Sequence, residues 1–119
     1  MKLAFHAVLA LAALNSPVLA VADPSSIQRV GEAREVILGI DADRAYGEYL
    51  AGDCVACHRL SGEPAGIPII HGQPVSDLIT ALLEYKLGVR TNEVMSVRTA
   101  RLGDQEIAAL AAHFAAQTK

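Results

Sequence analysis

The sequence has no tryptophan and few other aromatic residues, with three tyrosines and two phenylalanines among 119 residues. A chain of this length forms one small domain with a modest core, and little aromatic bulk is available to fill that core. The chain also lacks an excess of basic charge. Its formal net charge is −3 at pH 7, which argues against nucleic acid as a partner. It has no G-x-G-x-x-G run after a strand, which excludes a dinucleotide-binding motif of its own.

No apolar run is long enough for a comfortable membrane span. The N-terminus has instead the pattern of a secretory signal peptide, because Lys2 precedes a short apolar stretch over 3–14. Small residues around Ala22 fit the cleavage rule, so we expect residues 1–22 to be removed on export. The mature protein would then be periplasmic, with no membrane span. The alternative is that the same apolar stretch stays on the chain as an uncleaved anchor.

The chain has only two cysteines, and both lie in the run Cys54-Val55-Ala56-Cys57-His58. The pattern C-x-x-C-H is typical of an attachment site for c-type haem. The two intervening residues place both thiols on one turn, where they can form thioether bonds with the two vinyl groups of the porphyrin. The histidine follows at once, so its imidazole can reach the iron from the same side. We therefore expect one covalent haem c, which would also supply apolar bulk to the core.

Other kinds of C-x-x-C site fit the sequence less well. A thioredoxin-type redox pair lies in a βαβ context, and no alternating, β-branched strand flanks Cys54. A zinc site needs two further ligands at matched spacing, whereas His71 and His113 are widely separated. A disulfide between Cys54 and Cys57 would close a very small loop, which has little entropic value.

A six-coordinate haem needs a second axial ligand, and Met95 is the best candidate. The other methionine is lost with the signal peptide, and Met95 lies in a polar stretch, 91–96, that we expect to be a loop. The main alternative is His71, from a loop expected on the same side of the haem as His58. His113 is a weaker alternative, because we expect it to be solvated. Ligation by histidine and methionine fills both axial positions, raises the reduction potential and suits electron transfer.

Several other residues could lie near the haem. A backbone carbonyl near Pro68 could accept a hydrogen bond from Nδ1 of His58 and so fix the tautomer of the imidazole. Tyr46 and Tyr85 could reach the haem or its propionates, and ordinary core packing is the alternative for both. The nearest approach to a basic cluster is either solvated surface, which we favour, or a docking patch. Its residues are Arg90, Arg98 and Arg101.

Helical periodicity predicts three main helices in the mature chain, and strand signals are absent. The predicted helices cover residues 41–51, 74–87 and 104–117. Glycine and proline predict a loop over 59–72, and a second loop is expected over 89–103. Residues 23–40 carry two glycines among apolar and charged residues, so we expect an N-terminal arm in extended form or a poorly ordered linker. The predicted fold class is therefore all-α.

The chain resembles the small bacterial class I c-type cytochromes over about residues 43–117. The similar runs are "AYGEYLAGDCVACH", "GIPIIHGQP", "LLEYKLGVRTNEVM" and "LGDQEIAALAAHFAAQ". This resemblance implies a cytochrome c domain over 41–119, with three main helices and connecting loops wrapped around one covalent haem. It also implies that His58 and Met95 ligate the haem iron, and that the protein passes single electrons between redox partners.

Within that class, the chain is similar to the cytochrome subunit of flavocytochrome c sulfide dehydrogenase. This similarity implies a haem subunit that accepts electrons from a FAD-containing, sulfide-oxidising partner, has no catalysis of its own, and could wrap the partner with its N-terminal arm. The chain differs in having one haem domain instead of two, and in having Ser96-Val97 after Met95 in place of a Gly-Arg pair. The alternatives are a freely diffusing shuttle to a terminal oxidase or other acceptor, and an open-site haem sensor or peroxidase. The last requires that Met95 is not a ligand.

Overall fold

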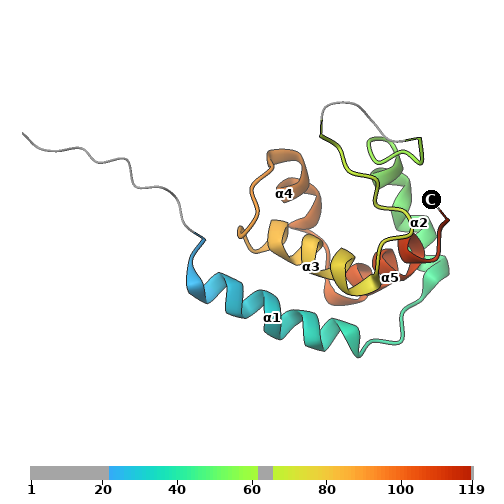
Figure 1. Ribbon diagram of the computed structural model, residues 1–119. Coiled ribbons are helices and arrows are strands. Elements are labelled where there is room, and N and C mark those ends of the chain that lie inside the picture. The colour runs from blue at the N-terminus through green and yellow to red at the C-terminus, as the bar shows by residue number, and fades with distance from the viewer. Residues whose placement is uncertain (1–21, 62–65, 119) are drawn as a thin grey trace, which may run out of the picture.

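A computed structural model describes residues 22–61 and 66–118, and over these residues the chain is helical with no strand (Figure 1). The helices are α1 (Pro24–Leu38), α2 (Arg44–Val55), α3 (Val75–Lys86), α4 (Glu93–Thr99) and α5 (Asp104–Ala115). The predicted all-α fold is confirmed. In the described part of the chain, each helix is too short or too polar to cross a membrane. The expected signal peptide lies outside the described residues, apart from its last residue.

The helices α2 and α5 cross in close contact, and this crossing anchors the end of the chain to the cysteine motif. Gly47 lies at the crossing, where a Cβ atom would come within 2.0 Å of the carbonyl oxygen of Ala109. Helix α5 buries Ile107, Leu110 and Phe114 on one face, which is the i, i+3, i+7 spacing of its sequence. This helix confirms the predicted element over 104–117 to within two residues.

Three expectations for the helices are wrong. Residues 24–38 form a helix instead of an extended arm or linker, because Val30 and Ile37 are buried in the core shared with α3 and α5. That burial outweighs the helix cost of Gly31, which is about 1 kcal/mol. Helix α2 does not end by residue 51 but continues to Val55. The expected loop over 89–103 contains α4, so Met95 lies on a helix.

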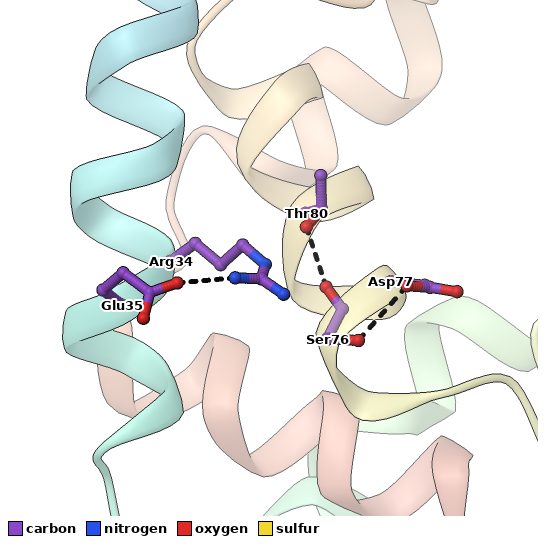
Figure 2. Close-up of polar contacts among 5 residues, drawn as sticks. All are labelled: Arg34, Glu35, Ser76, Asp77 and Thr80. Atoms are coloured by element: carbon purple, nitrogen blue, oxygen red, sulfur yellow. Dashed lines mark hydrogen bonds and ion pairs between the residues drawn. The ribbon is translucent and has the colours of Figure 1, made fainter.

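Helix α1 runs along α3 and α5 on one side of the molecule, away from α4 (Figure 1). Figure 2 shows the polar edge of its contact with α3. The side chain of Arg34 extends from α1 toward the first turn of α3 and pairs with Glu35 at 2.6 Å. Within α3, the hydroxyl of Thr80 donates a hydrogen bond to the carbonyl of Ser76 at 2.8 Å.

Candidate haem site

The C-x-x-C-H motif begins in the last turn of α2 and continues past the end of the helix at Val55. The carbonyl oxygen of Cys54 accepts hydrogen bonds from the backbone N–H groups of Cys57, at 3.2 Å, and His58, at 2.9 Å. The chain is therefore tightly coiled here, and both thiols come from one turn. The two thiols are not joined in a disulfide, and Cys54 is half-buried whereas Cys57 is exposed. Burial, followed by the negative charge of Asp53, raises the pKa of the Cys54 thiol.

His58 is buried, and a hydrogen bond fixes its ring. Its Nδ1 lies 2.8 Å from the carbonyl oxygen of Pro68. A carbonyl can only accept a hydrogen bond, so Nδ1 carries the proton and Nε2 is the free nitrogen. The structure thus contains the contact expected between His58 and a carbonyl near Pro68. In this tautomer, Nε2 can bind a metal.

A cavity of about 550 Å³ lies beside the motif. This volume is within the range of about 300–1,000 Å³ that is usual for cofactor sites. Cys54, Cys57 and His58 line it, and Met95 lines it from α4. The rest of the lining is largely apolar and includes Leu50, Ile70, Leu78, Leu82, Leu110 and Phe114. An apolar cavity with two thiols, a histidine and a thioether on its walls fits a covalently attached haem.

The other two candidate ligands do not line this cavity. His71 is buried, and its ring packs edge-on against Phe114 with the ring centroids 5.2 Å apart. The ring of His113 also packs edge-on against Phe114, with the ring centroids 5.2 Å apart. Nε2 of His113 lies 3.0 Å from Nε2 of Gln117. His113 is half-buried, whereas we expected it to be solvated. Of the proposed second ligands, Met95 is the one that lies on the cavity with His58.

The two tyrosines considered for the site have different positions. Tyr85 lines the cavity together with Arg90, whose guanidinium lies 5.3 Å from the centre of the Tyr85 ring. Tyr46 does not line the cavity; it is stacked on Tyr49, and its hydroxyl is within 3.4 Å of Glu106. Arg90 also forms an ion pair with Glu84 at 2.5 Å, so a charged pair lies at this edge of the cavity.

Sequence reasoning also missed Asn92 and Thr99, which line the cavity on either side of Met95. The side chain of Asn92 caps α4 by accepting the N–H of Met95 at 3.0 Å. Asparagine is a preferred residue at a helix N-terminus, so this signal was available in the sequence. Thr99 has no comparable sequence signal, because its contact depends on the helix being formed.

Comparisons with known proteins find c-type cytochromes among the relatives of this chain. The scan against protein-family models gives no match. The cytochrome subunit of sulfide dehydrogenase from Chlorobaculum tepidum is 35% identical over 69 residues, which is 57% of this chain. The match spans 63% of the length of that subunit, so it leaves a substantial part of the longer protein uncovered. Cytochrome c-554(548) from Halomonas halodenitrificans is 32% identical over 80 residues, 63% of this chain and 96% of that protein.

The all-α fold and the thiol-lined apolar cavity define a protein that carries covalent haem. The chain belongs to the class I c-type cytochromes, as its match to nearly the whole of cytochrome c-554(548) shows. Its cofactor is haem c, and its role is electron transfer through that haem.

Proposed function

We propose that this chain is an exported, periplasmic monohaem cytochrome that carries single electrons between protein partners. Cys54 and Cys57 would hold the haem through thioether bonds, and His58 and Met95 would be the axial ligands of its iron. The observation that carries the proposal is that all four side chains line one apolar cavity. When bound, the haem supplies a one-electron couple between ferric and ferrous iron.

The chain's own residues prepare this site for electron transfer. The carbonyl of Pro68 holds the imidazole of His58 in one orientation and one tautomer. With haem bound, the apolar lining, which includes Leu82 and Phe114, would limit the access of water to the cofactor. A fixed ligand in a dry, apolar surrounding needs little rearrangement when the charge of the iron changes.

Exposed apolar side chains around the motif support the docking of a protein partner there. They are Val55, Leu60, Ile67 and Ile69. Cys57 is exposed beside them, so the edge of the haem held by that thiol would lie near the surface. Transient redox encounters use small interfaces, which a rim of this kind can provide.

We further propose that the electron donor is a FAD-containing flavoprotein that oxidises sulfide. The support is the similarity to the cytochrome subunit of sulfide dehydrogenase from Chlorobaculum tepidum. The chain has no G-x-G-x-x-G motif, so the flavin would belong to the partner. Size-exclusion chromatography of the untagged protein from its native periplasm, followed by haem and flavin absorbance together, tests this assignment. Flavin in a larger species with the haem supports it, and haem alone at the size of one small domain indicates a free shuttle.

The ligand assignment predicts the behaviour of Met95→Ala. Removing the thioether should abolish the far-red absorption band of the ferric iron–sulfur bond and open the ferrous iron to carbon monoxide. His71→Ala is the matched control and should keep the band, because His71 lies off the cavity. If the Met95→Ala spectrum matches that of the wild type and the His71→Ala spectrum differs from it, His71 is the ligand instead. Rapid carbon monoxide binding by the wild type would indicate an open-site sensor or peroxidase.

A further inference from the structure

We infer that Asn92 and Thr99 are positioning residues that hold Met95 in place for the iron. The inference rests on the proposed ligation by Met95 and concerns what keeps that ligand in position. Both residues belong to the segment of α4 and its cap, and both line the cavity with Met95. They act on the backbone of Met95, not on its sulfur.

Both backbone polar groups of Met95 are bonded to side chains. The amide oxygen of Asn92 accepts the N–H of Met95 at 3.0 Å. The hydroxyl of Thr99 donates to the carbonyl of Met95 at 2.9 Å and is also 3.4 Å from the carbonyl of Ser96. Thr99 is fully buried, so water does not compete for its bond. The two side chains thus hold Met95 from its amino and its carbonyl side.

Helix α4 needs such bonds because little else stabilises it. It has seven residues, and a helix this short is marginal on its own. Among the described helices it packs on α3, and an exposed ion pair between Arg98 and Asp53, at 3.8 Å, is its link to α2. Exposed ion pairs of this kind contribute little to stability. Its outer face carries Val94 and Val97, which are 61% and 66% exposed. Met95 lies in the first turn, the part of a helix that frays when its cap is lost.

Fraying of this turn would move the Met95 side chain away from the iron. Carbon monoxide binds to the reduced protein only when that position is vacant, so its association rate reports how often Met95 is displaced. The reduction potential reports the same bond, because a thioether favours ferrous iron. Loss of either side-chain bond should therefore raise the rate and lower the potential.

The test uses the haem-loaded Asn92→Ala and Thr99→Val proteins. We expect each to bind carbon monoxide about fivefold faster than the wild type, the factor that corresponds to loss of one typical hydrogen bond. The far-red band of the ferric protein should weaken, and the midpoint potential should fall. Asn92→Asp and Thr99→Ser keep the acceptor and the donor, so both should return to wild-type rates.

Two matched controls break the same kinds of bond in other helices. In Asp43→Ala, α2 loses a side-chain cap to the N–H of Tyr46, also at 3.0 Å. In Thr80→Val, α3 loses the hydroxyl-to-carbonyl bond to Ser76 (Figure 2). Neither Asp43 nor Thr80 lines the cavity. Both controls should bind carbon monoxide at the wild-type rate, and an increase equal to that of Asn92→Ala would show a general loss of stability and overturn the inference.

The ligation and its positioning fail in different ways. If Met95→Ala binds carbon monoxide rapidly while Asn92→Ala and Thr99→Val match the wild type, Met95 is the ligand and the positioning inference is wrong. If Met95→Ala has the spectrum and the rate of the wild type, the ligation itself is wrong, and the inference falls with it.

Discussion

At the scale of single residues, His71 is the group whose titration should matter most for folding. It is 3% exposed, and its Nδ1 has no hydrogen-bond partner among the residues that the structure describes. Burial is the main cause that lowers the pKa of His71, and the neighbouring imidazoles of His113 and His58 lower it further. The folded protein therefore favours the neutral form of this imidazole more strongly than the unfolded chain does.

This lowered pKa predicts a loss of stability in mild acid. As the pH falls below about 6.5, the unfolded chain takes up a proton on His71 before the folded protein does. The contribution of His71 is thus fully present above that pH and is lost as the pH falls toward the folded pKa. His71→Leu should show a smaller drop in thermal midpoint between pH 7.5 and pH 5 than the wild type, measured on the ferric protein. His113→Gln is the comparison variant, and a drop in His71→Leu as large as that of the wild type would contradict the prediction.

The residues of the site differ in how far sequence alone could identify them. The cysteine motif is local, because its chemistry depends on five adjacent residues that end in His58. Met95 is proposed from the sequence largely by elimination, and the structure places it on a helix instead of the expected loop. The hydrogen bonds that Asn92 and Thr99 make with Met95 involve backbone groups of α4 that come together only when the helix forms. Sequence reasoning finds such pairs only once the helix boundary is known.

At the scale of helices, two glycines should respond in opposite ways to the same substitution. Gly47→Ala would place a methyl group 2.0 Å from the carbonyl oxygen of Ala109 and force α2 and α5 apart. We expect it to lower the free energy of unfolding by about 3 kcal/mol. Gly31 lies on α1, and the methyl group added in Gly31→Ala would have no neighbouring atom within 4 Å outside its own turn of the helix. This substitution should therefore raise the free energy of unfolding by about 0.5–1 kcal/mol. Denaturant unfolding of the ferric proteins measures both, and equal shifts of the same sign would contradict the crossing geometry.

The helices also show which sequence signals were sufficient. Helices α3 and α5 follow a clear apolar period, and their predicted ends agree with the structure to within two residues. Helix α2 was predicted too short, because Gly52 and Asp53 look like a helix end but are followed by one more half-turn. Helix α4 is too short to show a period, and α1 depends on tertiary burial of Val30 and Ile37 that no local pattern reveals.

At the scale of the whole molecule, the described helices differ in their relation to the cavity: four of them line it, and one packs outside it. Residues from α2, α3, α4 and α5 line it, together with the segment 66–73, whereas α1 contributes none. Helix α1 packs against α3 and α5 along the lower side of the molecule in Figure 1 and extends the apolar core there. Deleting α1 should therefore weaken the fold. Because α1 packs on the core, it is not an arm that is free to wrap a partner.

The apolar lining of the cavity predicts that the protein depends on its haem for folding. Without haem, lining side chains such as Leu82, Leu110 and Phe114 would lose an apolar packing partner and face water. Burying one side chain of this kind stabilises a domain by about 1.5–3 kcal/mol, so the loss of several such contacts would remove much of a typical stability of about 5–15 kcal/mol. The double variant Cys54→Ala/Cys57→Ala, which cannot attach haem, should retain helical circular dichroism but lose a cooperative thermal transition.

Cys57→Ala is the control for this prediction, because it keeps the half-buried thiol of Cys54 for one thioether bond and should still unfold cooperatively. Near-ultraviolet circular dichroism checks the same point, since fixed aromatic packing around Phe114 requires a filled cavity. If the haem-free double variant unfolds cooperatively within a few degrees of the haem-loaded protein, the helices alone supply the stability. The apolar cavity would then be a site that binds haem without being completed by it.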